Sequence, residues 1–188
     1  MRENAEKSST PMTDMNDDFS AAQIFEINRG YESGVDVSIY RKPIYKQAQM
    51  RQIRLGLENG LSENEIGRYI NPKFSSLNME IIRMGLEKHF PVEKYASLSF
   101  DANQMWEIYI GFTKKLKAED IDKYANPVYN AQQMQQIRLG LENGLSVDFY
   151  ADPAKNAMEM ELIRQRLFDN RKNTLGKKIK DTIKVWKG

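Results

Sequence analysis

Apolar residues recur at helical spacing in a short segment near the middle of the first half of the chain. Met50, Ile53 and Leu57 fall at positions i, i+3 and i+7, which places them on one face of a helix. Polar residues occupy the positions between them. Gly60 follows and can supply the left-handed conformation that commonly ends a helix. The pattern therefore predicts an amphipathic helix over 48–59 that stops at a glycine.

This segment is repeated along the chain. The eleven residues QIRLGLENGLS at 52–62 occur again without a change at 136–146. A glycine inside each expected main helix recurs at intervals of 26, 29, 26 and 29 residues, at Gly30, Gly56, Gly85, Gly111 and Gly140. Self-similarity at a fixed period indicates a repeat architecture. We therefore predict an all-α, solenoid-like array of about six short units, each with a main helix followed by a short helix or turn.

The alternating interval predicts two kinds of linker. Each helix stop is followed by a tyrosine. The tyrosine lies six positions after the stop in one kind of linker, at Tyr40, Tyr95 and Tyr150, and nine positions after it in the other, at Tyr69 and Tyr124. Three residues are close to one helical turn of ~3.6 residues. We therefore expect short helices over 62–70 and 117–125, and single turns in the shorter linkers. Ser62 and Glu65 have the spacing of a capping box, which supports a helix start there.

The glycine inside each main helix needs a common explanation, because glycine costs ~1 kcal/mol relative to alanine in a helix. We expect a neighbouring helix to approach too closely for a side chain. Arg166 occupies the equivalent position in the last expected main helix, 157–168, which suits a terminal unit without a following repeat. The stop position of that helix falls at Asn170, and His89 and Lys115 occupy two other stop positions.

Composition limits the classes of protein that the chain can belong to. It has 188 residues, 40% of them apolar, and no cysteine, which excludes disulfides and cysteine-based zinc sites. It shows no signal-peptide core and no apolar run of the ~18 residues that a membrane span requires. We expect a cytoplasmic protein with a disordered tail over 1–18, a repeat domain over 19–170 and a basic amphipathic helix over 171–188.

No pattern in the sequence points to catalysis. His89 is the only histidine, and neither a phosphate-binding nor a dinucleotide-binding glycine motif is present. A histidine at a helix stop, without ligand or triad partners, is best interpreted as structural. We therefore predict no enzymatic activity, no cofactor and no metal site.

One arginine per unit forms the first candidate site. Arg54, Arg83 and Arg138 occupy equivalent positions, as in repeat proteins that read one base per repeat. Each has a glutamate four residues later, so the alternative is a set of surface pairs worth ~0.2–0.5 kcal/mol each. We favour the surface pairs, because the carboxylates would compete with phosphate.

The fourth unit differs from the others and forms the second candidate site. Trp106 and Tyr109 replace the charged residues, and Lys114 and Lys115 follow; Phe25 holds the Trp106 position in the first unit. Aromatic residues on a solvent-facing stripe are typical anchors of protein interfaces. The alternative is that other elements cover them and make an ordinary core.

The C-terminal segment is the third candidate. Residues 171–188 carry seven Lys/Arg and one Asp, whereas the other 170 residues carry 21 basic and 25 acidic groups. Leu175, Ile179, Ile183 and Trp186 form an apolar stripe, and the lysines of the candidate surface are Lys177, Lys178, Lys180, Lys184 and Lys187. Such a helix can bind nucleic acid, an acidic protein or a membrane surface, or it can simply cap the array.

The repeated phrase resembles a known kind of repeat. The pattern Met-x-x-Ile-Arg-x-Gly-Leu-Glu-x-Gly-Leu, at 50–61 and 134–145, with Tyr-Ala-Asp-Pro at 150–153, is similar to short helical repeats in phage and conjugative-element proteins of Gram-positive bacteria. The resemblance implies a cytoplasmic accessory protein of a mobile element and carries no catalytic residues.

Two functions remain open at this point. The first is stoichiometric binding of another protein, and the mobile-element resemblance makes a host defence nucleoprotein complex (anti-CRISPR-like inhibition) a hypothesis for the partner. The alternative is a nucleic-acid-binding accessory protein that uses the C-terminal helix. The sequence leaves the oligomeric state open.

Overall fold

The computed structural model describes the backbone of residues 18–186 and the side chains of residues 18–175, and the regular structure of this range is entirely helical. The main helices are α1 (Ala21–Ser33), α2 (Gln47–Glu58), α4 (Ser76–Glu87), α5 (Ala102–Thr113), α7 (Ala131–Glu142) and α8 (Ala157–Trp186). The prediction of an all-α protein is confirmed. The expected disordered tail lies outside the described residues, except for Asp18.

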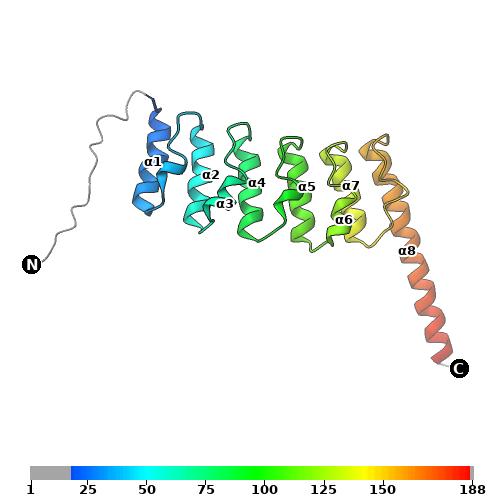
Figure 1. Ribbon diagram of the computed structural model, residues 1–188. Helices are drawn as coiled ribbons and strands as arrows, with labels where there is room; N and C mark the ends of the chain where they lie inside the picture. Colours follow the sequence, from blue (N-terminus) through cyan, green and yellow to red (C-terminus); the bar gives the residue numbers. More distant parts are fainter. Residues whose placement is uncertain (1–17, 187–188) are drawn as a thin grey trace, which may run out of the picture. The chain divides into compact units, whose positions relative to one another are not determined.

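The chain forms two compact units, one up to Met79 and one from Glu80 onward. In the first unit, α1 packs against α2 (Figure 1). In the second, α5 packs against α7 and α7 packs against α8 (Figure 1). Helix α4 begins in the first unit and continues into the second. The repeated sequence segment therefore produces side-by-side main helices within each unit.

The linkers have the two expected forms. The longer ones contain α3 (Glu63–Gly67) and α6 (Ala118–Asp122), which lie within the predicted ranges. Two of the shorter ones contain single 3₁₀ turns, η2 (Val37–Ile39) and η3 (Val92–Lys94). At the start of α3, the Glu65 amide donates to Ser62 Oγ, and the Ser62 amide donates to the Glu65 carboxylate at 2.9 Å. The predicted capping box is therefore confirmed.

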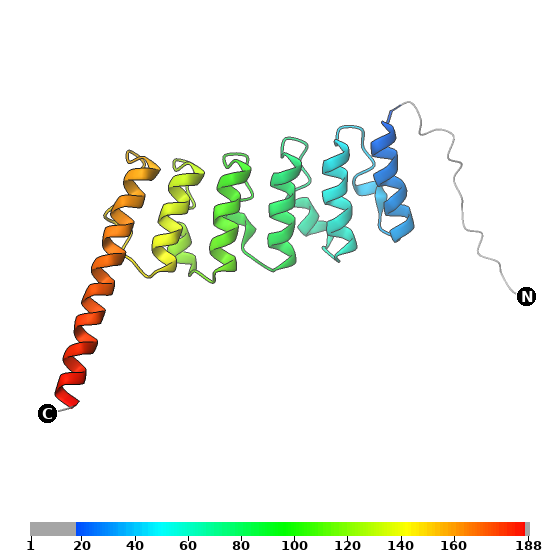
Figure 2. The same cartoon turned by 180° about the vertical axis from the view of Figure 1, so that it is seen from behind.

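The helix stops are confirmed in all but the last unit. Gly34, Gly60 and Gly144 have φ of 73°, 84° and 62°, and His89 and Lys115 adopt the same left-handed conformation. The predicted stop at Asn170 is wrong, because α8 continues without a break to Trp186 (Figure 2). Residues 167–175 contain neither proline nor glycine, so nothing in the local sequence interrupts the helix.

A tyrosine, and not a neighbouring helix, explains the glycines inside the main helices. A Cβ atom at any of the five glycines would lie between 1.7 and 2.1 Å from a tyrosine hydroxyl of the following linker. The pairs are Gly30–Tyr40, Gly56–Tyr69, Gly85–Tyr95, Gly111–Tyr124 and Gly140–Tyr150. The expectation of a close approach was right, but the expected partner was wrong. Helix α8 continues to Trp186, so no linker tyrosine folds back over position 166 there, which lets Arg166 occupy the equivalent position.

These tyrosines also bind the helix backbone. The Tyr124 hydroxyl donates to the Glu107 carbonyl at 3.3 Å, and the Tyr40 hydroxyl donates to the Glu26 carbonyl at 3.1 Å. Burial raises the pKa of Tyr40 and of Tyr150 to about 12, so both hydroxyls remain protonated donors over the physiological range. Four linkers are thereby fixed against the main helix that precedes them, through Tyr40, Tyr69, Tyr124 and Tyr150.

A glutamine in the first turn links four of the main helices, α1, α2, α5 and α7, to the next linker. In α5, Gln104 Oε1 accepts from the Asp101 amide at 2.8 Å, while its Nε2 donates to the carbonyls of Pro127 and Tyr129 at 3.2 and 2.6 Å. Gln23, Gln49 and Gln133 make the same two kinds of contact. One side chain thus caps its own helix and also positions the entry to the following main helix.

Tyr95 offers a test of these contacts, because its buried hydroxyl has no hydrogen-bond partner among the described residues. We expect Tyr95→Phe to change the free energy of unfolding by less than about 0.5 kcal/mol, or to stabilise the protein, since an unsatisfied polar group is removed. Tyr124→Phe should cost about 1 kcal/mol, because a buried hydrogen bond is lost. Denaturant unfolding followed by circular dichroism measures both. An equal loss in the two variants would contradict the assignment.

Candidate partner-binding surface

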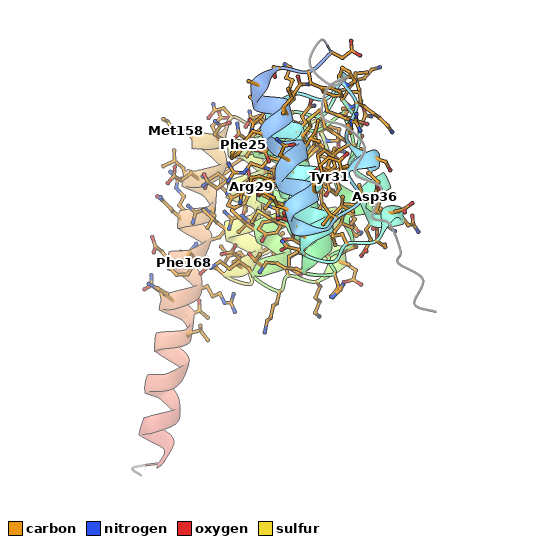
Figure 3. The ribbon with its side chains drawn as sticks, turned by 90° about the vertical axis from the view of Figure 1, so that its left-hand side faces the viewer. Phe25, Arg29, Tyr31, Asp36, Met158 and Phe168 are labelled. Carbon is orange, nitrogen blue, oxygen red and sulfur yellow. The ribbon has the colours of Figure 1, made fainter. Side chains whose placement is uncertain are left out.

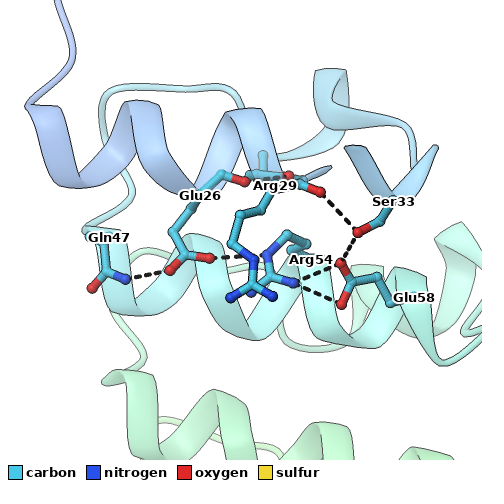
Figure 4. A network of polar contacts seen from close by, with 7 residues as sticks. Glu26, Arg29, Ser33, Gln47, Arg54 and Glu58 are labelled. Carbon is cyan, nitrogen blue, oxygen red and sulfur yellow. Dashed lines mark hydrogen bonds and ion pairs between the residues drawn. The ribbon is translucent and has the colours of Figure 1, made fainter. Parts of the chain in front are cut away.

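Arg54 is the centre of a buried polar network in the first unit (Figure 4). Its Nε donates to Glu26 of α1 at 3.0 Å, and its Nη1 donates to both oxygens of Glu58 at 2.6 and 2.7 Å. Gln47 donates to the second oxygen of Glu26, and Ser33 donates to Glu58. The Arg54 side chain is only 2% exposed. The network therefore joins α1 to α2 and is closed to solvent on the arginine side.

The charged groups of this network stabilise one another in their ionised forms. Burial alone would raise the pKa of the Glu58 carboxyl, but hydrogen bonds from Ser33 and Arg54, and the positive charges of Arg54 and Arg29, hold it below its ordinary value. For Arg54, burial acts to lower the pKa, and the two carboxylates outweigh it and raise it. Because the pKa of Glu58 is depressed on folding, its stabilising contribution is present above the pKa of the unfolded state and is lost as the pH falls through the folded value.

The second unit contains a network of the same form. Arg138 of α7 donates through Nε to Glu107 of α5 at 2.8 Å and through Nη1 to Glu142. Arg83 donates to Glu87 at 2.6 Å within α4. Arg164 of α8 donates to the Gln136 side-chain oxygen at 2.9 Å, in the position where Glu107 accepts from Arg138. Arg138 and Arg164 therefore join successive main helices, whereas the Arg83–Glu87 pair lies within α4.

These contacts correct the interpretation of the arginines. The i,i+4 pairs with Glu58, Glu87 and Glu142 are present, but they are not surface pairs, because Arg54, Arg83 and Arg138 are all buried. Two of the three also bind a second carboxylate from the preceding main helix. A guanidinium in this state would have to break a buried ion pair to reach a phosphate, which argues against base reading by these residues.

The arginine position changes to an aromatic residue in α5. Tyr109 replaces the arginine there, and Ile81 of α4 stands where α1 and α5 have Glu26 and Glu107. Both side chains are buried. The Tyr109 ring lies 5.8 Å from that of Phe90, and Phe90 stacks on Phe112 at 5.4 Å. Of the two alternatives that the sequence left open, Tyr109 therefore follows the covered one, and its side chain belongs to an aromatic cluster.

Trp106 is the exposed member of the same cluster. Its indole stacks on the Tyr109 ring with a centroid distance of 5.2 Å and an angle of 19° between the planes. The side chain is nevertheless 42% exposed. Tyr109 is thus the buried support, and Trp106 presents an aromatic surface to solvent. The two alternatives from the sequence both apply, one to each residue.

Phe25 is exposed as well but belongs to the first unit. It is 56% exposed, and the Arg29 guanidinium lies 5.8 Å from its ring centroid, on the same side of α1 (Figure 3). Lys114 and Lys115 are exposed at the end of α5, where Lys115 supplies the left-handed stop. They lie eight and nine residues beyond Trp106, which corresponds to roughly 12 Å along a helix. The two lysines therefore flank the aromatic surface at one end.

The beginning of the basic C-terminal segment is attached to α7. Arg171 of α8 donates to the carbonyls of Asn143 and Gly144, the latter at 2.7 Å, which places a cation at the C-terminal end of α7. Lys172 lies over the Phe168 ring at 4.5 Å. Lys177, Lys178, Lys180, Lys184 and Lys187 fall outside the described side chains. A deletion that tests these lysines should therefore begin after Lys172, so that the Arg171 contacts are kept.

Sites of other kinds have little support in the part of the chain that the structure describes. No group of three or more His, Asp or Glu side chains there could hold a metal ion. No helix within residues 18–186 combines the length and apolar character needed to cross a bilayer. The chain matches no protein-family model, no curated protein and no solved structure. The exposed indole of Trp106, stacked on the buried Tyr109, is the candidate that the geometry itself supplies.

Proposed function

We propose that this chain is a non-enzymatic binding protein: a solenoid-like array of helical repeats, with an amphipathic C-terminal helix, that binds a protein partner stoichiometrically through the surface around Trp106. The observation that carries the proposal is the stacking of a 42%-exposed tryptophan on a buried tyrosine. At this position α2 and α7 carry the polar residues Arg51 and Gln135. Tryptophan and tyrosine are the residue types most enriched at the energetic centres of protein interfaces.

The support beneath Trp106 is favourable for binding. Ordering a side chain at an interface costs about 0.5–1.5 kcal/mol when that side chain is mobile beforehand. Tyr109, held by Phe90, already limits the orientations of the indole. A partner that covers the ring therefore gains the burial of a large apolar surface with a small loss of conformational entropy. In this proposal the buried ion pair of Arg138 with Glu107, which joins α7 to α5, holds the main helix that carries the surface.

The resemblance to repeats of mobile-element proteins adds a proposal only about the kind of partner and the place in which the protein acts. A cytoplasmic accessory factor that binds a host defence complex would be consistent with a protein that acts by binding. Base reading by Arg54, Arg83 and Arg138 has less support, because all three side chains are buried. The lysines of the C-terminal helix, on which the nucleic-acid alternative chiefly depends, lie outside the described side chains. We therefore place the protein partner first.

Affinity capture with a matched control tests the proposed function. Purified wild-type chain, Trp106→Ala and Phe149→Ala are immobilised in equal amounts and exposed to host-cell lysate, and bound proteins are quantified by mass spectrometry. Phe149 is a suitable control because it is an exposed aromatic residue of the same unit, 69% exposed, outside the aromatic cluster. We expect a protein to be retained near one-to-one by the wild type and by Phe149→Ala, and to be reduced at least tenfold by Trp106→Ala, since interface anchors contribute about 2 kcal/mol or more. Equal retention by all three chains would overturn the proposal.

A further inference from the structure

A row of aliphatic side chains occupies one repeat position of the main helices, the position directly before the recurrent glycine. The first and last main helices have polar residues at this position, Arg29 and Gln165. The four inner ones have Leu55 in the first unit and Met84, Ile110 and Leu139 in the second. All four aliphatic side chains are partly exposed. The second unit therefore presents three aliphatic side chains, the aliphatic row, that its own fold does not cover completely.

The aliphatic row lies on the same side of the main helices as the exposed indole. Trp106, four residues before Ile110, is 42% exposed, and Lys114, four residues after Ile110, is exposed as well. On α7, the residues four before and four after Leu139 are also exposed. Because residues four apart share one side of a helix, Ile110 and Leu139 face solvent in the middle of that side. Trp106 and the row therefore form one surface.

Buried ion pairs keep successive main helices in one register. Glu107 of α5 accepts from Arg138 of α7, and Arg54 of α2 binds the equivalent glutamate of α1. Helices α5 and α7 pack side by side (Figure 1). The shared register places Ile110 and Leu139 at nearly the same level on these two helices. Since packed helices lie about 8–10 Å apart, the row advances by about that distance from one main helix to the next.

Lysines without acidic partners border the row on one side. Lys88 lies four residues after Met84, and Lys114 and Lys115 lie four and five residues after Ile110. All three lysines are exposed, and within residues 18–175 none of them forms an ion pair. The glutamates that end α4 and α7 do not neutralise them, because buried arginines bind both carboxylates. Electrostatic complementarity therefore calls for carboxylates of a partner at this border.

We propose that this surface binds an amphipathic helix of the protein partner, which lies across the main helices. Its apolar side covers Met84, Ile110 and Leu139, and carboxylates along one edge face the three lysines. Trp106 packs against the opposite edge of the apolar side. The inference rests on the proposed function, because it names the form and the charge of the segment that the surface recognises.

The spacing of the row matches a helix better than other segments. An α-helix advances about 10.5 Å in seven residues and returns to nearly the same side, so positions i, i+7 and i+14 reach three successive main helices. In an extended strand, residues three apart span about 10 Å but face opposite sides. A polyproline II segment repeats every ~9.3 Å, but such segments dock in grooves lined by aromatic residues, whereas the row is aliphatic.

A single-tryptophan protein allows this binding to be measured. The chain has two tryptophans, so Trp186→Phe leaves Trp106 as the only indole. Its emission is recorded during titration with an 18-residue peptide that has leucine at positions 2, 6, 9, 13 and 16, glutamate at positions 3, 10 and 17, and alanine and glutamine elsewhere. A second peptide carries lysine in place of glutamate, and a third carries proline at positions 8 and 11, which prevents a helix.

The three peptides test the charge and the form of the partner segment. We expect a saturable change with the glutamate peptide, binding weaker by about fivefold or more with the lysine peptide, and no saturable change with the proline peptide. No response to the glutamate peptide, or equal responses to the glutamate and lysine peptides, would overturn the inference. Equal binding of the proline peptide would overturn the helical form of the segment.

Changes in the protein give the second measurement. In the same background, Leu139→Gln should weaken binding of the glutamate peptide by about fivefold or more, because an apolar contact is lost. The control is Leu98→Gln, a 51%-exposed leucine in a linker of the same unit, which should leave the affinity within about twofold. Circular dichroism confirms that each variant is folded. Equal affinities of the two variants would mean that the row is not the binding surface.

Charge reversal tests the basic border without disturbing the packing. Lys114→Glu should weaken binding of the glutamate peptide by about threefold or more, and raising the salt from 50 to 500 mM should reduce this difference. Lys42→Glu makes the same change of charge at an exposed lysine of the first unit and should leave the affinity within about twofold. Equal effects of the two reversals would show that only the net charge of the protein matters.

The capture experiment separates this inference from the proposed function. Leu139→Gln and Lys114→Glu should each reduce capture of the protein that Trp106→Ala loses. If Trp106→Ala loses the partner while the other two variants retain it fully, the proposed function stands and the helix across the row is wrong. If Trp106→Ala retains the partner, the proposed function fails, and the peptide titration still decides whether the row binds an acidic helix.

Discussion

Gly111→Ala should lower the free energy of unfolding by about 2 kcal/mol, although alanine is the better helix former by about 1 kcal/mol. A Cβ atom at this position would lie 2.0 Å from the Tyr124 hydroxyl oxygen, 3.3 Å from its Cζ and 3.4 Å from Ile121 Cγ1. Tyr124 is fully buried, so the ring cannot move aside without disturbing the linker that contains α6. Overpacking of this kind typically costs 1–3 kcal/mol, and the loss is read from denaturant midpoints.

A double-mutant cycle identifies the atom responsible. In the variant Gly111→Ala/Tyr124→Phe the hydroxyl is gone, and the remaining contacts of the new methyl group, at 3.3 and 3.4 Å, need only small adjustments. We expect the double variant to be more stable than the sum of the single losses predicts, by at least about 1 kcal/mol. Arg166→Ala, at the same register in α8 and without a tyrosine above it, should cost less than about 0.5 kcal/mol. Additive losses in the cycle would contradict the steric explanation.

Local patterns were sufficient to predict the helices and their linkers. The i, i+3, i+7 spacing and the glycine stops identify the main helices, and three added residues identify α3 and α6, because these signals act within a few positions. The helix bounds differ from those expected by a few residues, as they do for 48–59 against Gln47–Glu58. The continuation of α8 was missed because position 170 was assigned a stop by analogy with the other units, although Asn170 adopts no such turn.

The contacts between elements were harder to predict, because they join residues distant in sequence. The tyrosine in every linker was visible, but its spacing of 10 or 13 residues from the preceding helix glycine did not show that its hydroxyl fills the space of the missing side chain. A glutamine lies seven residues before that glycine in four units, at Gln23, Gln49, Gln104 and Gln133. This constant distance could have indicated a shared role. A polar residue repeated at one register indicates a repeated hydrogen bond.

The candidate site was predicted only in part. The sequence identified Trp106 and Tyr109 as exceptions to the repeat, but periodicity cannot tell which of two residues on one helical face is covered by a neighbour. The burial of the arginines had a detectable cause: Glu26 lies 28 residues before Arg54, and Glu107 lies 31 residues before Arg138, which is about one repeat in each case. Where Tyr109 replaces arginine, Ile81 replaces the glutamate, so both members of the pair change together.

The buried ion pair between Glu107 and Arg138 should be essential where no isoleucine–tyrosine pair, such as Ile81 and Tyr109, takes its place. Arg138→Met should lower the free energy of unfolding by about 3–5 kcal/mol, because it leaves the Glu107 carboxylate, whose side chain is 10% exposed, without its buried partner. Methionine keeps much of the volume of arginine, so the loss reports the charge and not a cavity. Urea unfolding followed by circular dichroism provides the measurement. Lys155→Met, which breaks an ion pair between partly exposed side chains in the same unit, is the control and should cost less than about 1 kcal/mol.

A residue pair already present in the chain should restore the stability that Arg138→Met loses. The double variant Glu107→Ile/Arg138→Tyr reproduces between α5 and α7 the residue pair found at Ile81 and Tyr109. Since replacing a buried ion pair by packed apolar groups is often neutral or stabilising, we expect the double variant to recover most of the loss seen in Arg138→Met. Recovery would show that the glutamate–arginine pair and the isoleucine–tyrosine pair are alternative ways to join successive main helices. A loss as large as that of Arg138→Met would mean instead that the position requires the ion pair, and that Tyr109 depends on the aromatic cluster of Phe90 and Phe112 beneath Trp106.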